Sequence, residues 1–213
     1  DERVVRAIQE QAAILPYANP FMATEPRARL GAKLAEITPG DIDCFFFTNG
    51  GAEANENAIK VARWYTGRQK ILARYRSYHG GTAGAITLTG DPRRWASEPS
   101  IPGVIHVRDP YHGIQKGWDT AEAALAELEE IIQLEGANTI AAFILEPVTG
   151  TNGILIPPDG YLQGVRALCD KYGILMIADE VMAGFGRTGK WFSIEHWNVV
   201  PDIITMAKGL TSA

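Results

Sequence analysis

Two apolar, strand-like segments each lead into a single polar group. Residues 173–178 lead to Asp179, and residues 202–207 lead to Lys208. An ionised Asp at the end of a core strand loses several kcal/mol of hydration unless a cation or hydrogen-bond donors meet it. Two interpretations follow. Asp179 and Lys208 form a structural ion pair, or they are a carboxylate and an amine that take part in chemistry.

A glycine-rich turn precedes a helix-like segment earlier in the chain. Gly50, Gly51 and Ala52 open directly into residues 53–60, which have helical character. The first turn of a helix carries free backbone N–H groups and the positive end of the helix dipole. The turn therefore predicts an anion site suited to phosphate, and the alternative is a turn needed only for tight packing.

Two other strand-like segments also end in polar residues. Tyr78 and His79 offer a flat aromatic face and a titratable ring, which suit stacking on a planar cofactor, although a packed Tyr and a hydrogen-bonded core His have the same pattern. Glu146 is a second carboxylate after an apolar segment, and Pro147 fits a sharp exit from the sheet. The simplest role for Glu146 is that of a hydrogen-bonded supporting group.

One cofactor matches these groups taken together. Pyridoxal 5′-phosphate has a phosphate for the glycine turn, a planar ring for Tyr78, a ring-nitrogen cation for Asp179 and an aldehyde for Lys208. A lysine forms a Schiff base with that aldehyde, and an Asp beside the pyridinium keeps the ring nitrogen protonated, so the ring can take up electrons from a substrate carbanion. The combination predicts a pyridoxal-phosphate enzyme.

The elements that must position these residues alternate between short strands and helices. Such alternation predicts an α/β fold, with a mostly parallel sheet flanked by helices on both faces. In an open sheet of this kind, ligands bind at the carboxyl ends of the strands, where the polar groups above are found. The predicted strands are residues 44–48, 71–75, 85–89, 104–107, 140–145, 174–178 and 203–206.

Two helices have clear start and stop signals. One begins after Asp159 as N-cap and ends at Gly173, and another follows Thr120. Residues 90–102 and 111–119 are predicted to be long loops, and no domain boundary is predicted within the chain.

Composition narrows the class of protein. Lys and Arg number 20 against 25 Asp and Glu among 213 residues and are scattered, which argues against nucleic acid or an anionic membrane as partner. Apolar segments are too short to span a bilayer, so we expect a cytoplasmic protein. Cys44 and Cys169 have no metal-ligand spacing and are expected to be buried, reduced thiols.

Five segments, in order along essentially the whole chain, resemble one family. The segments are residues 48–56, 78–82, 145–148, 179–189 and 201–209. They are similar to class III pyridoxal-phosphate-dependent aminotransferases of fold type I, in the omega-aminotransferase group. The acidic stretch that begins at Asp179, followed by residues 184–189 and then by Lys208, is highly specific to that family.

The resemblance implies a role for each matching residue. Lys208 would hold the cofactor as a Schiff base and then move the proton between the substrate carbon and the cofactor, and Asp179 would bind the pyridinium nitrogen. The implied cofactor-binding set also includes Gly50, Gly51 and Ala52 at the phosphate, Tyr78 and Val181 on the two ring faces, and His79 and Glu146 as supporting groups.

The resemblance also implies a reaction and a partner. The enzyme would transfer an amino group from an amine or omega-amino acid to a 2-oxo acid such as pyruvate, and would act as a homodimer. Family members are longer, so residues 1–213 would form an incomplete large domain without the N-terminal segment and the C-terminal small domain. Many relatives place hydroxyl residues where this chain has Gly50 and Ala52, so we expect somewhat weaker phosphate binding.

The sequence also allows other functions. An aminomutase or a dialkylglycine decarboxylase would share the fold and the lysine. Residues 184–190 match a short nucleotide-binding motif, but Trp191 stands where a P-loop needs Ser or Thr, and no helix-forming segment follows. Arg187 could bind a substrate carboxylate, or tie its loop to neighbouring groups, which is the role we favour.

Overall fold

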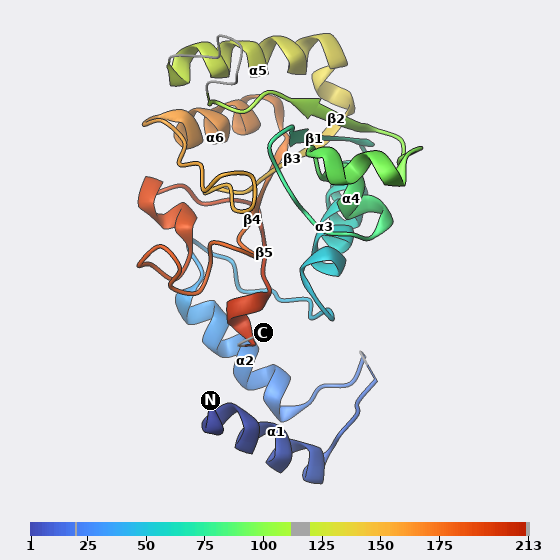
Figure 1. The fold of residues 1–213 in the computed structure, drawn as a ribbon, viewed down its shortest axis with the longest axis vertical. Helices are drawn as coiled ribbons and strands as arrows, with labels where there is room; N and C mark the ends of the chain where they lie inside the picture. Colours follow the sequence, from blue (N-terminus) through green and yellow to red (C-terminus); the bar gives the residue numbers. More distant parts are fainter. Residues whose placement is uncertain (20, 112–119, 212–213) are drawn as a thin grey trace. The chain divides into compact units, whose positions relative to one another are not determined.

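The computed structural model describes residues 1–19, 21–111 and 120–211, which form two compact units. The first unit, residues 1–46, contains α1 (Glu2–Ile14) and α2 (Glu25–Ile37) (Figure 1). The Asp1 carboxylate accepts a hydrogen bond from the Arg3 N–H at 2.9 Å and so caps α1. The second unit begins at residue 47 and carries the predicted site residues.

A five-stranded parallel sheet forms the centre of the second unit. Its strands are β1 (Lys70–Arg74), β2 (Val104–Val107), β3 (Ile140–Leu145), β4 (Leu175–Asp179) and β5 (Ile203–Thr205), in the order β2-β1-β3-β4-β5. Every residue of the central strand β3 is apolar and buried, as expected of a strand covered on both faces. The predicted α/β fold with a parallel sheet is confirmed.

Helices cover the sheet. They are α3 (Gly51–Thr66), α4 (Ala83–Leu88), α5 (Ala121–Glu135) and α6 (Tyr161–Tyr172), and Figure 1 shows α3 and α4 on one side of the sheet with α5 and α6 on the other. Four short 3₁₀ segments lie in the connections: η1 (Pro92–Ser97), η2 (Ala137–Thr139), η3 (Ser193–Trp197) and η4 (Lys208–Leu210).

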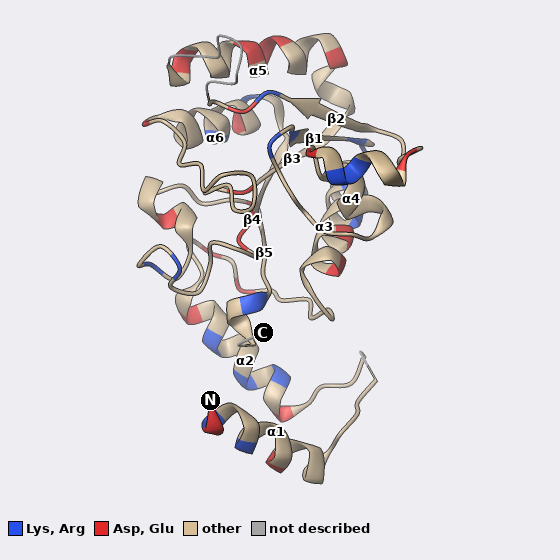
Figure 2. Cartoon of the chain, in the orientation of Figure 1, with Lys and Arg blue, Asp and Glu red and all other residues tan. Residues whose placement is uncertain are grey.

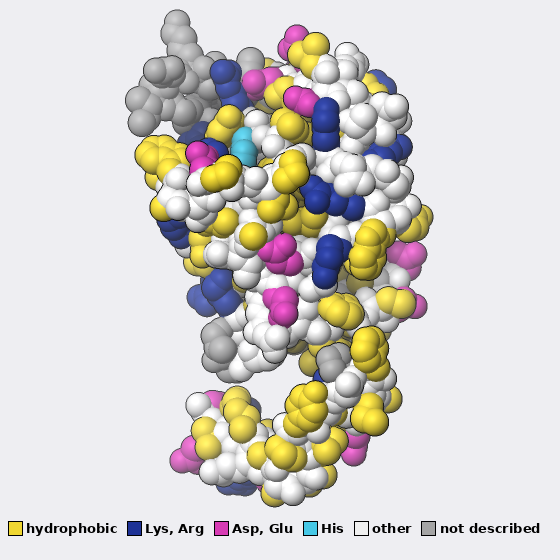
Figure 3. Space-filling view, turned by 90° about the vertical axis from the view of Figure 1, so that its right-hand side faces the viewer, with side chains coloured by type: hydrophobic (Ala, Val, Ile, Leu, Met, Phe, Trp, Pro, Cys, Tyr) yellow, Lys and Arg dark blue, Asp and Glu magenta, His cyan; other side chains and the backbone are white. Residues whose placement is uncertain are grey.

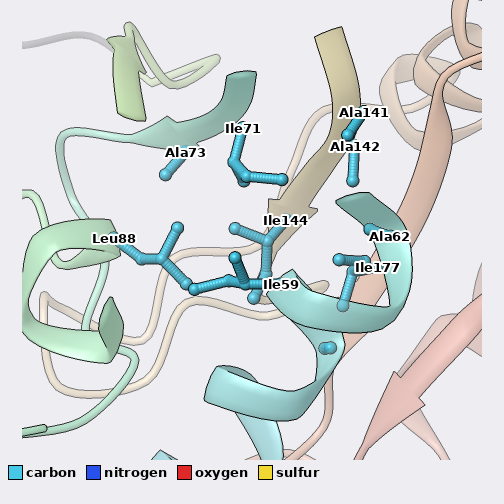
Figure 4. Packing of buried hydrophobic residues seen from close by; sticks show 10 residues of the cluster. Ile59, Ala62, Ile71, Ala73, Leu88, Ala141, Ala142, Ile144 and Ile177 are labelled. Atoms are coloured by element: carbon cyan, nitrogen blue, oxygen red, sulfur yellow. The ribbon is translucent and has the colours of Figure 1, made fainter. Parts of the chain in front are cut away.

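The core between α3 and the sheet determines which polar side chains face α3. Ile59 of α3 packs in one buried cluster with Ile144 of β3 and Ile177 of β4 (Figure 4). Side chains two residues apart along a strand point to the same face. Asp179 and Glu146, each two residues beyond one of these isoleucines, therefore emerge on the face of the sheet that α3 covers.

Two predicted strands are wrong. Residues 44–48 have no regular structure, and the segment predicted as strand 85–89 belongs to α4. The reason in the second case is a cap supplied from another helix. The Glu56 carboxylate of α3 accepts hydrogen bonds from the N–H groups of Gly84 (2.6 Å) and Ala85 (3.2 Å), which satisfies the free donors of the first turn of α4.

The helix signals in the sequence mark helix ends to within about two residues. The Thr120 hydroxyl accepts from the Ala123 N–H at 3.2 Å, which confirms its predicted place at the start of α5. Gly173 ends α6 with a φ of 62°, again as predicted. The N-cap of α6 is Gly160 and not Asp159, because the chain turns through a left-handed residue before the helix begins.

Surface features agree only in part with the sequence-based expectations. Figure 2 shows acidic and basic residues interspersed along α2, and Figure 3 shows both signs on the visible face. Cys169 is buried, and burial raises its pKa to about 12, but Cys44 is exposed because its segment is not a strand. Within the described residues, no helix could cross a membrane, and no cluster of three or more His, Cys, Asp or Glu side chains could hold a metal.

Candidate active site

Asp179 is a buried carboxylate with three N–H donors around it. Its side chain is 3% exposed. One oxygen, Oδ2, accepts from Asn55 Nδ2 at 2.8 Å and lies 2.7 Å from His79 Nδ1, while Oδ1 accepts from the Val181 N–H at 3.0 Å. An ionised carboxylate can only accept, so His79 carries a hydrogen on Nδ1. These donors offset the cost of burying the charge.

Lys208 lies at the same edge of the sheet. Strands β4 and β5 are paired in parallel with Asp179 opposite Thr205, and Lys208 follows three residues later. Its φ of 44° is unusual for a residue with a side chain. Lys208 is exposed, and its side chain makes no hydrogen bond or ion pair with any described residue. The interpretation of Asp179 and Lys208 as a structural ion pair is therefore wrong.

The glycine turn leaves the N-terminus of α3 open. Gly50 is the N-cap residue, and no side chain caps the helix. The Glu53 carboxylate accepts instead from the Asn49 N–H at 2.6 Å, outside the helix. The N–H groups of Gly51 and Ala52 have no acceptor in the described part of the chain. A 16-residue helix that presents free donors at its positive end can bind an anion.

Two glycines allow close packing around this turn. A Cβ on Gly51 would lie 2.8 Å from Val181 Cγ1, so the backbone of the turn packs directly on that side chain. A Cβ on Gly80 would lie 2.5 Å from Ala52 Cβ, and Gly80 has a φ of 137°. The turn is thereby packed against the residue after Asp179–Glu180 and against the segment that carries Tyr78 and His79.

Replacing Gly80 by alanine is expected to destabilise the fold by about 2–4 kcal/mol, because the new methyl group meets Ala52 and the backbone is strained. Denaturant unfolding measures the change. Gly81→Ala is the matched control, since a Cβ at Gly81 meets nothing within 4 Å. Equal stability of Gly80→Ala and Gly81→Ala would contradict the close approach.

Tyr78 is half-buried beside a cation that the sequence did not reveal. The guanidinium of Arg93 lies 3.8 Å from the centre of the Tyr78 ring. Arg93 is held by the Asp91 carboxylate at 3.0 Å and by the Thr151 hydroxyl at 2.8 Å. Arg93 thus lies over one face of the Tyr78 ring. Arg93 lies in η1, in a segment that we predicted only as a loop.

The Glu146 carboxylate is hydrogen-bonded to two main-chain N–H groups. Its Oε1 accepts from the Tyr78 N–H at 3.0 Å and its Oε2 from the Gly150 N–H at 2.8 Å. Burial raises the pKa of the Glu146 carboxyl, and the nearby charge of Asp179 raises it further. Glu146 thus fixes the backbone on which the Tyr78 ring is mounted.

Glu180 anchors the loop that follows β4. Its fully buried carboxylate accepts from the Ser193 hydroxyl at 2.8 Å and the Ile194 N–H at 2.8 Å. Within that loop, the Phe185 N–H donates to the Trp191 carbonyl, so residues 184–191 form a compact turn. No α-helix begins there. The nucleotide-binding interpretation is wrong, because a P-loop motif needs a helix after the turn.

Burial raises the pKa of Glu180 above its ordinary value of 4.5. The folded state therefore binds more protons than the unfolded state above pH 4.5, and this contribution to stability is complete below that pH and lost as pH rises through the folded pKa. In wild type, the free energy of unfolding should therefore fall with rising pH, by at most about 1.4 kcal/mol per pH unit. We expect Glu180→Gln to lack this fall, because the variant has no carboxyl group to titrate. Urea unfolding of both proteins across this pH range tests it, with Glu130→Gln on the exposed face of α5 as control. Parallel curves for wild type and Glu180→Gln would contradict it.

Comparison with known proteins identifies the family. The model of the family "Aminotransferase class-III" matches residues 1–213. The chain belongs to the class-III aminotransferase family. An omega-aminotransferase from Caulobacter vibrioides is 43% identical, over 99% of this chain and 51% of that protein.

Solved structures of transaminases also resemble this chain. The taurine:2-oxoglutarate aminotransferase from Bifidobacterium kashiwanohense, in complex with PLP and glutamate, has a TM-score of 0.92 at 48% identity, covering 98% of this chain and 49% of that one. An (S)-enantioselective omega-transaminase from Thermomicrobium roseum has a TM-score of 0.91 at 45% identity, covering 98% and 50%. The class-III aminotransferase chain described here thus spans about half the length of the relatives it matches.

In this class-III aminotransferase chain, the predicted site residues His79 and Val181 contact Asp179 directly, and Gly51 packs on Val181. The sequence-based interpretation missed Asn55, which is wholly buried against Asp179. A signal was present, because Asn55 is spaced by four residues from Ile59 and so lies on the inward stripe of α3. Lys208 is placed by strand pairing alone, and exposed Arg187 makes none of the loop-tying contacts expected of it within the described residues.

Proposed function

We propose that the protein carrying this chain is a pyridoxal-phosphate-dependent aminotransferase that moves an amino group from an amine or omega-amino acid to a 2-oxo acid such as pyruvate. The observation that carries the proposal is the buried Asp179 carboxylate, held by three N–H groups on the sheet edge where Lys208 is free. The names of the relatives support it, since they include an omega-aminotransferase and a taurine:2-oxoglutarate aminotransferase.

The residues fit pyridoxal phosphate by their chemistry. The open N-terminus of α3 supplies N–H donors for a phosphate, and Asp179 is an anion in a site otherwise rich in donors. We propose that Gly51 and Ala52 bind the phosphate through their N–H groups and that Asp179 pairs with the ring nitrogen. Tyr78 and Val181 would enclose the ring.

Lys208 has two tasks in this proposal. Its exposed amine would hold the cofactor through the aldehyde, with loss of water. Once the amine of the substrate has displaced it, the freed Nζ would take the proton from the substrate carbon that carries the amino group. When bound, pyridoxal phosphate supplies an electron sink that stabilises negative charge at that carbon. Asp179 supports this by keeping the ring nitrogen positively charged, and the Asn55 and His79 donors hold Asp179 in place.

The family relationship also supports an assembly. We propose a homodimer with the site near the subunit interface, as the resemblance to the family implies. Sedimentation or light scattering of the complete protein measures this directly.

The deciding experiment uses the complete protein that contains this chain. Its visible absorption spectrum is recorded with pyridoxal phosphate, before and after borohydride, and the modified peptide is identified by mass spectrometry. The proposal expects a coloured complex that borohydride fixes covalently on Lys208, and amino transfer from an amine or omega-amino acid to pyruvate or 2-oxoglutarate. A coloured complex that only rearranges or decarboxylates its substrate would favour an aminomutase or a dialkylglycine decarboxylase. A folded, colourless protein would overturn the proposal.

A further inference from the structure

Asn55 joins three elements of the site through one amide group. It lies in α3, one helical turn after Gly51, and is 0% exposed. Its Nδ2 donates to Asp179 Oδ2 at the end of β4 (2.8 Å) and to the main-chain carbonyl of His79 (2.7 Å). One side chain thus connects the phosphate-binding helix, the carboxylate and the segment that carries Tyr78.

The orientation of the Asn55 amide follows from its partners. A carboxylate and a carbonyl are both acceptors, so both must face the NH₂ group of Asn55, and its two hydrogens are both used. The Asn55 Oδ1 is left buried without a partner among the described residues. A flipped amide would oppose two acceptors with an oxygen and is excluded.

Burying the polar side chain of Asn55 is less favourable than burying an apolar one at the same position. Ile59 and Ala62 continue the same inward stripe of α3 and are buried in the apolar core (Figure 4). An apolar residue at position 55 would extend that core and leave no orphaned oxygen. A buried polar group with an unpartnered atom costs about 1–3 kcal/mol, so its donors are expected to serve the site.

We propose that Asn55 is a positioning residue that holds the Asp179 carboxylate in register with the N-terminus of α3. The spacing from Gly51 to Asn55 is four residues, or about 6 Å along the helix axis. This fixed offset lets one rigid helix set both the phosphate donors and the carboxylate that meets the ring nitrogen. The inference rests on the proposed function, because it assigns the two ends of that arrangement to one cofactor.

The test compares two ligands in the complete protein. Dissociation constants are measured by fluorescence quenching for pyridoxal phosphate and for an analogue in which C–H replaces the ring nitrogen. Wild type is expected to favour pyridoxal phosphate by about a hundredfold, since a charge-assisted hydrogen bond forms only with the nitrogen. In Asn55→Ala this preference is expected to fall below about tenfold, because the carboxylate is no longer held in register.

Asn57→Ala is the matched control. Asn57 lies in the same helix, and within the described residues its side chain donates only to the Glu53 carbonyl, at 2.8 Å, so the ligand preference is expected to be unchanged. Asn55→Leu repeats the measurement with a side chain of the same number of heavy atoms that extends the apolar stripe, in case the alanine variant folds poorly.

The outcomes separate this inference from the proposed function. If wild type binds neither ligand, or binds both equally, the pairing of Asp179 with the ring nitrogen fails and the inference fails with it. If wild type keeps its preference and Asn55→Ala and Asn55→Leu weaken both ligands equally, Asn55 is only structural and the proposed function stands. Loss of the preference in both Asn55 variants supports the positioning role.

Discussion

Lys208→Ala is expected to lower kcat/KM for amino transfer by at least about a thousandfold in the complete protein, because in the proposed function this substitution removes both the amine that binds the cofactor and the group that moves the proton. Since Lys208 is exposed and its side chain makes no hydrogen bond or ion pair with a described residue, the free energy of unfolding is expected to change by less than about 0.5 kcal/mol. Alanine also has a Cβ, so the φ of 44° at this position is equally costly in both proteins.

Steady-state kinetics and borohydride trapping together measure this effect. The variant should bind pyridoxal phosphate reversibly but form no covalent adduct after reduction. A small amine added to the assay should restore part of the activity, because it can take over the proton transfer that Lys208 performs. Lys190→Ala is the matched control, since Lys190 is exposed and, within the described residues, its side chain hydrogen-bonds only to the Glu195 carbonyl, at 3.0 Å. Full activity in Lys208→Ala would contradict the assignment of this residue.

The parallel sheet could be predicted because its strands satisfy local rules. Residues 140–145 are uniformly apolar, which is typical of a strand covered on both faces, and the structure has β3 there without a shift. The positions of Asp179 and Lys208 then follow from topology, since parallel neighbours bring their carboxyl ends to one edge. Predicting the positions of Asp179 and Lys208 required no knowledge of side-chain contacts.

Features that depend on a partner from elsewhere in the chain could not be predicted. Residues 85–89 have the composition of a strand, but the Glu56 carboxylate accepts from the N–H groups of Gly84 and Ala85, and α4 forms instead. Arg93 likewise meets Tyr78 only after the chain has folded. Sequence periodicity shows which side of an element is buried and not which side chain it meets. For this reason Asn55 was visible as a polar residue on an apolar stripe, while its contact with Asp179 was not.

Asp179→Asn tests the role of the negative charge of Asp179. The substitution keeps the shape of the side chain and its ability to accept from Asn55 and His79, but it removes the negative charge. Its amide NH₂ would also face the Val181 N–H, which now donates to Oδ1 at 3.0 Å, so two donors would meet. We expect unfolding to become easier by about 1–3 kcal/mol and kcat/KM to fall by about a thousandfold.

The larger effect on catalysis than on folding is the signature of a charge that acts on the cofactor. A neutral amide cannot keep the ring nitrogen positively charged, so the electron sink is weakened even when the site is saturated, and the fall should lie in kcat more than in the KM for the amine. Asp170→Asn controls for the loss of one carboxylate, at an exposed position whose only ion-pair partner among the described residues is Arg166. Should Asp179→Asn raise only the KM for the amine, Asp179 would act on substrate binding and the pairing with the ring nitrogen would be wrong.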